Sequence, residues 1–273
     1  MTAAATTSSP RTSASDLACW NAVQHFMLRT CGVVLREDQA YLVDARLGGV
    51  AKLHGFTRIA AFVTAACASA STTPLAGALI DAMTTHETLF FRDPTFWKFL
   101  EVSVFPKLAA RTGPVRIWSA ACSTGQEPYS IAMLLDEKFP QLAARVEIVA
   151  TDVSELAVER AKSGTYISIE VNRGLAAARL IRHFDQSCGS YKVREHLRQR
   201  ITWSVHNLLG IRPDPVNCEL VLCRNVLIYF GETDRAAVAK RLLQATAPGG
   251  VLGVGSTETL RGTQLAPGLY SRT

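Results

Sequence analysis

The sequence predicts an α/β protein in which a parallel sheet with helices on both faces follows a small all-α unit. Three observations predict it. Apolar residues recur at helical spacing over residues 16–82. Beyond Gly113, short β-branched runs alternate with helical segments, which is typical of a parallel sheet. The 273 residues are 48% hydrophobic, enough for the core of one large domain or of one domain with a small partner.

The N-terminal part of the chain divides into three segments. Residues 1–15 are mostly Ala, Ser and Thr, and we expect a disordered tail. Residues 16–82 form the predicted helical domain. Residues 83–112 are expected to be a linker and site-covering segment, because its first part, M-T-T-H-E-T-L-F-F-R-D-P-T, is polar and then aromatic. The last domain is predicted over 113–273.

Strands and helices alternate in this last domain. The expected strands are 115–119, 146–152, 201–205, 219–223 and 251–255, and the expected helices are 128–139, 154–163 with Ser154 as N-cap, and 233–247. Some 35 residues separate the second helix from the third strand. That is too long for a plain crossover, so we expect an inserted small element there.

Composition excludes several classes of protein. No run of 18 apolar residues and no signal-like N-terminus occur, which indicates a cytoplasmic protein without membrane insertion. The seven cysteines are scattered without a C-x-x-C pair, which argues against a disulfide framework or a zinc site, and we expect no metal. Nothing demands more than a monomer.

Positive charge is concentrated in one segment. Residues 173–200 hold seven basic side chains and two acidic ones, out of a net charge of +6 for the chain. Either this segment is a solvated basic face, or it meets an acidic partner or nucleic acid.

Ligands of open parallel sheets bind beyond the carboxyl ends of the strands. The residues at these ends are Ala120–Glu127, Asp152, His206–Leu208, Arg224–Tyr229 and Ser256–Glu258. The loop 120–127 has neither a Walker sequence nor G-x-G-x-x-G, so it does not suit a phosphate chain. Its small residues admit a ligand near the backbone, and Gly125 is where we expect close approach. Glu127 favours a cationic ligand without phosphates, and S-adenosylmethionine fits.

Two further positions at this edge carry chemistry. A carboxylate at Asp152, after the second strand, could accept both ribose hydroxyls, or could be a helix-capping or turn aspartate. Arg224 and Asn225 follow a buried strand in C-R-N-V-L-I-Y-F, where they are costly unless paired. In the same motif, Tyr229 and Phe230 could be ordinary packing aromatics.

The sequence resembles the CheR family of chemotaxis receptor glutamate methyltransferases, which use S-adenosylmethionine. The likeness covers about residues 16–273 and rests on five ordered motifs. These are T-x-E-T-x-F-F-R-D (85–93), S-A-A-C-S-T-G-Q-E-P-Y-S (119–130), A-T-D (150–152), H-N-L (206–208) and C-R-N-V-L-I-Y-F (223–230). The resemblance implies a Rossmann-like class I methyltransferase sheet with a small inserted antiparallel β-subdomain near 165–200.

The resemblance also implies the roles of individual residues. Cofactor contacts would fall on His86, Thr88, Arg92, Glu127, Asp152, Asn207, Leu208, Arg224 and Asn225. Arg92 and Tyr229 would lie near the transferred methyl group and are the expected catalytic residues. His86 stands where the family typically has Asn, and Gln126 replaces a common Glu.

The partners that the resemblance implies are the glutamate-rich cytoplasmic helices of chemoreceptors, and no nucleic acid. The basic residues of 173–200, with Arg46, Lys52 and Arg58, would meet such a helix, unless they form a solvated surface. The subdomain loop 185–190 is short, which favours the type that does not dock a tethered receptor peptide. Two alternatives stay open: a methyltransferase acting on RNA or a small molecule, and a non-catalytic adenosylmethionine sensor.

Overall fold

The structure is a computed structural model that describes residues 14–272, and it divides into two compact units. Residues 1–13 of the expected tail lie outside the described residues, whereas residues 14 and 15 already belong to a helix. The first unit comprises 14–30 and 34–83, and the second comprises 31–33 and 84–272.

The first unit is all-α. Its helices are α1 (Ala14–Cys31), α2 (Tyr41–Leu53), α3 (Ile59–Ala68) and α4 (Pro74–Met83), with a 3-10 turn η1 (Glu37–Gln39). Val23, Leu47, Phe62 and Leu79, one from each α-helix, are fully buried and form its core. The apolar residues at helical spacing therefore face one another, as their periodicity predicts.

The second unit opens with an extended stretch, 84–93, followed by three short helical pieces. These are α5 (Pro94–Phe99), the π-helical turn η2 (Leu100–Val104) and α6 (Phe105–Ala109). No helix is predicted here from the sequence. Pro94 and Pro106 mark helix starts in this stretch, where a proline loses no hydrogen bond. Phe96 and Phe105 bury their rings in the core of the sheet domain.

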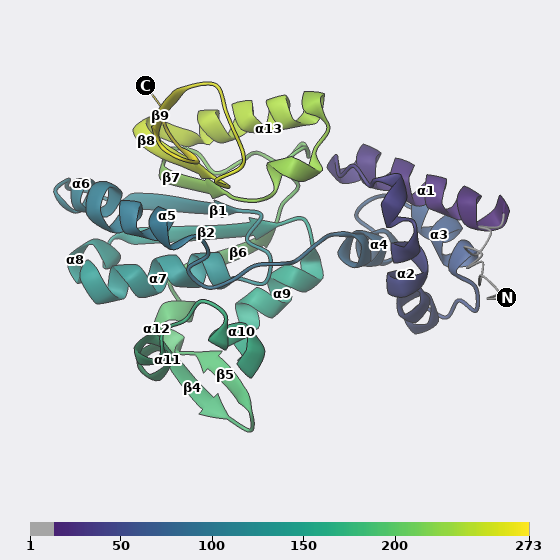
Figure 1. Ribbon diagram of the computed structural model, residues 1–273, viewed down its shortest axis with the longest axis horizontal. Helices are drawn as coiled ribbons and strands as arrows, with labels where there is room; N and C mark the ends of the chain where they lie inside the picture. The colour runs from purple at the N-terminus through teal and green to yellow at the C-terminus, as the bar shows by residue number, and fades with distance from the viewer. Residues whose placement is uncertain (1–13, 273) are drawn as a thin grey trace, which may run out of the picture. The chain divides into compact units, whose positions relative to one another are not determined.

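The main sheet has seven strands. They are β1 (Val115–Ala120), β2 (Val146–Asp152), β6 (Ile201–Val205), β7 (Cys218–Cys223), β8 (Thr246–Val254), β9 (Thr263–Ala266) and β10 (Leu269–Ser271). Their order is β6-β2-β1-β7-β8-β10-β9, and β10 pairs antiparallel with both neighbours while the other pairings are parallel. This confirms the expected Rossmann-like, class I methyltransferase sheet (Figure 1).

Both faces of the sheet are covered, as a buried parallel sheet requires. Ile117 and Leu220 pack with α7 (Gln126–Lys138), α5 and α6 on one face. Their neighbours Trp118 and Val221 pack with α13 (Glu232–Ala245) on the other face. Figure 1 shows α7 and α13 on opposite sides of the sheet. After β2, helix α9 (Glu155–Ser163) starts as predicted, because the Ser154 hydroxyl accepts the Ala157 N–H at 3.0 Å.

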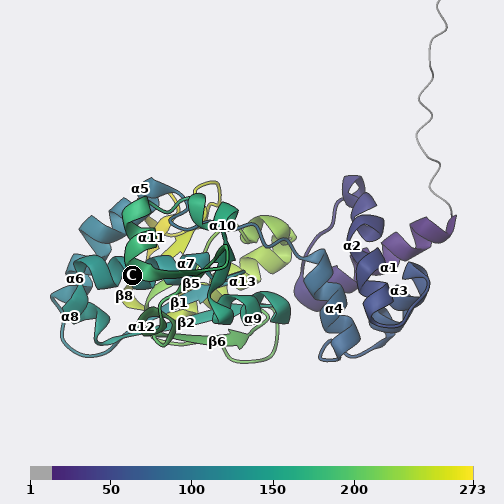
Figure 2. The ribbon, with the colours of Figure 1, turned by 90° about the horizontal axis from the view of Figure 1, so that it is seen from below.

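The insertion between α9 and β6 is a small antiparallel subdomain, as the resemblance implies. Its three-stranded sheet has the order β3-β5-β4, and Figure 2 shows it from below the main sheet. Its strands are β3 (Thr165–Ile167), β4 (Phe184–Ser187) and β5 (Ser190–Val193), and its helices are α10 (Ser168–Asn172), α11 (Ala177–His183) and α12 (Glu195–Arg198). A two-residue turn with positive φ at Cys188 and Gly189 joins β4 to β5.

Most of the basic residues of 173–200 have acidic partners. Five ion pairs join Arg173 to Glu87, Arg179 to Glu137, Arg182 to Asp136, Arg194 to Asp185 and Arg198 to Glu195. Three of these acids lie outside the segment, so counting charge within it overstated the basic surplus. Among residues 14–272, no helix has the length and apolar character needed to cross a membrane.

Candidate functional site

The loop after β1 has an unusual backbone. Ala121, Ser123 and Gly125 all have positive φ, at 60°, 52° and 95°. Left-handed backbone costs a non-glycine residue roughly 1–2 kcal/mol, and such strain concentrates at functional sites. The Cys122 N–H donates to the Thr151 carbonyl at 2.8 Å, which ties the loop to the end of β2. The loop is therefore built into a strained shape by its neighbours.

Gly125 lies in close contact with other parts of the protein. A Cβ at this position would lie 2.8 Å from Cβ of Ala161 and 3.1 Å from the Tyr166 hydroxyl. The close approach at Gly125 therefore comes from α9 and β3 of the protein itself. Its glycine lets the inserted subdomain and α9 pack against the start of α7.

Asp152 supports the loop from the end of β2. Its carboxylate accepts the Ser123 N–H at 2.8 Å and the Ser154 N–H at 3.0 Å, so the turn role is realised. Burial raises the pKa of Asp152, while the Ser154 N–H and a charge on His86 act to lower it. A carboxylate oxygen can accept a second hydrogen bond, so the capacity to take ribose hydroxyls is retained.

His86 lies beside the same loop. Its carbonyl accepts the Ser123 hydroxyl at 3.0 Å, and its ring Nε2 is 2.9 Å from the Thr84 hydroxyl. Thr88, two residues further along this extended stretch, is half-buried. The segment 84–93 thus contacts the loop through the hydrogen bond from the Ser123 hydroxyl to the His86 carbonyl.

Glu127 and Arg224 form a buried ion pair at the centre of the site. Arg224 donates to Glu127 at 3.2 Å and to Asp93 at 2.6 Å, and its guanidinium lies over the Phe96 ring at 4.1 Å from the centroid. The other oxygen of Glu127 accepts the Ser119 hydroxyl at 2.8 Å. The charge of Glu127, on which the preference for a cationic ligand rested, is therefore partly offset by Arg224, while Asp93 adds a second negative charge.

Arg92 is fixed through its backbone. Its carbonyl accepts the Arg224 guanidinium at 2.9 Å and the Trp97 indole N–H at 2.8 Å. The half-buried side chain donates to the Glu87 carbonyl at 3.3 Å. The guanidinium of Arg92 is therefore tied to neutral backbone by this bond, while its Cα position is set by two buried donors.

The turn after β7 depends on Glu258, which the sequence analysis placed at the sheet edge without a role. Its carboxylate accepts the N–H groups of Asn225 at 2.9 Å, Gly255 at 2.5 Å and Ile228 at 3.3 Å. Asn225 has a φ of 60°, a strained value that these bonds hold in place. Tyr229 ends the 3-10 turn η3 (Leu227–Tyr229) that follows, so Glu258 shapes the segment presenting Tyr229.

Asn207 and Leu208 follow β6 at the same edge of the sheet. The His206 N–H donates to the Asp152 carbonyl at 2.8 Å, which puts this segment next to the end of β2. Asn207 accepts the Leu209 N–H at 2.9 Å through its side-chain oxygen. The Leu208 side chain belongs to the buried core on the α13 face, so a ligand would meet Leu208 chiefly through its backbone.

Two buried side-chain atoms, on consecutive residues, have no hydrogen-bond partner in the described part of the chain. They are Nε of Arg224, a donor, and Oδ1 of Asn225, an acceptor. An amino-acid group pairs a carboxylate acceptor with an ammonium donor and matches this combination. The residues therefore fit the methionine moiety of S-adenosylmethionine, and Asp152 fits its ribose.

Comparison with known proteins agrees with this geometry. Residues 86–269 match the family described as CheR methyltransferase, SAM binding domain. The chain belongs to the CheR family. It is similar to chemotaxis protein methyltransferase 1 of Pseudomonas aeruginosa PAO1, with 37% identity covering 90% of this chain and 94% of that one. It is also 37% identical to chemotaxis protein methyltransferase Cher2 of Pseudomonas putida KT2440, over 89% and 94% of the two chains.

Membership of this family makes the chain a methyltransferase that uses S-adenosylmethionine. Another relative, the chemotaxis protein methyltransferase of Vibrio parahaemolyticus, is 34% identical over 87% of each chain. The matched region, 86–269, contains the strained loop, the Arg224 ion pairs and the Glu258 turn.

Changing Glu258 to Gln tests the support of the turn. The amide keeps the size but turns one acceptor oxygen into a donor that faces backbone N–H groups, so we expect the turnover number to fall about tenfold or more, since small misplacements are costly. Methyl transfer and cofactor-product binding should be measured together, with the exposed Glu232→Gln as the control. Unchanged turnover in a folded Glu258→Gln protein would show that the turn does not need this carboxylate.

Proposed function

We propose that the chain transfers the methyl group of S-adenosylmethionine to glutamate side chains on the cytoplasmic helices of chemoreceptors, forming methyl esters. The main support for this proposal is the group of contacts made by Arg224. Arg224, of the C-R-N-V-L-I-Y-F motif, contacts Arg92 and Asp93 of the motif 85–93, and Glu127 of the motif 119–130, at one site. Cytoplasmic location follows from this substrate, and the family membership supports the reaction class.

The proposed reaction needs no general base. A glutamate has a reference pKa of about 4.3 and is ionised at neutral pH, so its oxygen is already a nucleophile. Bound S-adenosylmethionine supplies an activated methyl group. The work of the protein is then placement and electrostatics.

Arg92 and Tyr229 are proposed to orient the receptor carboxylate. The backbone of Arg92 is immobilised by Arg224 and Trp97, and Tyr229 stands on the turn that Glu258 supports. The Arg92 side chain donates a weak hydrogen bond to the neutral Glu87 carbonyl. The positive charge of Arg92 is therefore available to a substrate carboxylate. A guanidinium in that state can orient a substrate carboxylate without a competing ion pair.

Cofactor contacts are proposed for the nine positions that the resemblance implies. Within this set, Asp152 and Asn207 are polar side chains at adjacent strand ends, and Arg224 with Asn225 fits the amino-acid group. Leu208 would contribute backbone, and Thr88 and His86 lie on the segment that contacts the loop.

The receptor-facing surface is less basic than the sequence count suggests. Five arginines of 173–200 already face acids. Arg46 and Lys52 lie six residues apart on α2 and point about 120° apart around the helix axis, so they do not share a face. The receptor helix would therefore meet scattered positive charges rather than one continuous basic face.

Ester formation can be tested directly. The protein, labelled S-adenosylmethionine and receptor-enriched membranes are incubated together, and the product is treated with mild alkali. We expect label on the receptors that alkali releases as methanol, because methyl esters are base-labile. Label that survives alkali, or label on RNA or small molecules, contradicts the proposal. Cofactor binding with no transfer at all would identify the sensor alternative.

A pair of substitutions separates binding from turnover. Asp152→Ala removes the ribose acceptor and the brace on Ser123, so we expect cofactor affinity to weaken at least about tenfold. Tyr229→Phe removes only a hydroxyl, so turnover should fall more than affinity does. Titration calorimetry with the cofactor product and initial rates give both quantities, and thermal unfolding checks that each variant folds. Equal loss of binding in the two variants would contradict the role of Tyr229.

Independence from a tethered receptor peptide is a further part of the proposal. The β4–β5 connection is only the two-residue turn at Cys188 and Gly189, which offers little loop for docking an extra strand. We expect equal methylation rates for full-length receptors and for receptors shortened at the C-terminus. A large rate loss on shortening, reversed when the tail is restored, would show that this subdomain does dock the peptide.

A further inference from the structure

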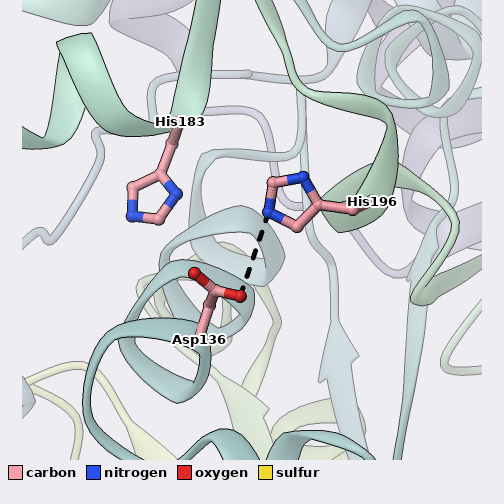
Figure 3. A group of neighbouring side chains, drawn as sticks. All are labelled: Asp136, His183 and His196. Atoms are coloured by element: carbon pink, nitrogen blue, oxygen red, sulfur yellow. Dashed lines mark ion pairs between the residues drawn. The ribbon is translucent and has the colours of Figure 1, made fainter.

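Three potential metal ligands meet away from the proposed catalytic site. Asp136 lies on α7, His183 ends α11 and His196 lies on α12, and one ligand atom of each is within 4.8 Å of the others. Figure 3 shows the two imidazoles and the carboxylate pointing toward one another. Nε2 of His196 is 3.9 Å from Oδ1 of Asp136.

His183 has the hydrogen-bond arrangement that suits a metal ligand. Its side chain is fully buried, and its Nε2 is 2.9 Å from a Glu137 oxygen. Because an ionised carboxylate only accepts, Nε2 carries a proton, and in the neutral ring Nδ1 then presents a lone pair. That Nδ1 is buried without a hydrogen-bond partner in the described structure, and it faces the other two side chains (Figure 3).

Glu137 is itself firmly placed. Arg179 donates to both of its oxygens, at 2.9 Å and 3.1 Å from Nε and at 2.9 Å from Nη2. A carboxylate behind a histidine, fixing its tautomer, is the usual support of a metal-bound imidazole. A buried nitrogen lone pair with this support, and with no donor among residues 14–272, can bind a metal ion.

We propose that Nδ1 of His183, Nε2 of His196 and Oδ1 of Asp136 bind a divalent transition-metal ion of the Zn²⁺ class. Two imidazoles and one carboxylate suit such an ion, whereas Mg²⁺ prefers oxygen ligands alone. The expectation of no metal rested on the cysteine pattern, which has no bearing on histidine ligands.

The geometry allows this ion with small movements. Tetrahedral bonds of about 2.0–2.1 Å place ligand atoms about 3.3 Å apart, so each pair closes by at most about 1.5 Å. The side chains of Asp136 and His196 are partly exposed and can move that far. Arg182 pairs with Oδ2 of Asp136 at 3.2 Å, which leaves Oδ1 toward His196. A water molecule would complete four ligands.

The ion would connect two parts of the fold. Helix α7 begins at the end of the loop that follows β1, whereas α11 and α12 belong to the inserted subdomain. A bound metal would therefore tie the subdomain to the helix that carries Glu127 and raise the stability of this unit.

The test uses the full chain, freed of metal by a chelator, with Cys188→Ser as background to remove an exposed thiol. Zn²⁺ is titrated against a competing indicator. We expect one equivalent to bind, and His196→Ala and Asp136→Asn each to weaken binding at least about tenfold. His25→Ala, at an exposed histidine of the first unit, should leave binding unchanged. The unfolding midpoint should rise with Zn²⁺ and not with Mg²⁺.

Co²⁺ provides an independent readout, because its visible absorption reports the ligand geometry. We expect a tetrahedral spectrum that His196→Ala abolishes. The proposal is overturned if no stoichiometric Zn²⁺ binding occurs, or if binding survives both His196→Ala and Asp136→Asn in folded protein.

Discussion

The buried guanidinium of Arg224 is the constraint on which the site depends. It reaches Glu127 on α7, and Asp93 and the carbonyl of Arg92 before α5, so one side chain joins these two segments to the turn after β7. A buried ion pair gives little net stability, but loss of one partner costs about 3–5 kcal/mol because a charge is left unpaired. The proposed cofactor-binding residues and the proposed substrate-binding residues are thus positioned by the same guanidinium.

Most strands and helices of the sheet domain could be predicted from local sequence patterns. The strands β1, β2, β6 and β7 coincide with short β-branched runs, and Ser154 caps α9 as its position predicts. The helical pieces in 94–109 were not predicted from their aromatic sequence. What makes them helical is burial of Phe96 and Phe105 in the sheet domain, a tertiary effect that periodicity over so few residues does not show.

The sequence predicted which residues lie at the site, but not which side chains pair with one another there. Polar residues at strand ends pointed to Glu127, Asp152 and Arg224. That Arg224 pairs with Glu127 depends on contacts across 97 residues of sequence. The same holds for the basic segment, where Arg179 finds Glu137 across 42 residues. Charge counted along a sequence is therefore a poor guide to charge left on a surface.

Glu258 lies after β8, and its bonds to Asn225 and Ile228 cross about thirty positions of chain. During synthesis, β1, β2, β6 and β7 are all made before this carboxylate exists. Until it arrives, the strained turn at Asn225 lacks the acceptor for its own N–H, which a buried backbone group requires. A chain ending before residue 258 would lack the acceptor that holds this turn. The turn that presents Tyr229 is thus completed only once the chain extends past β8.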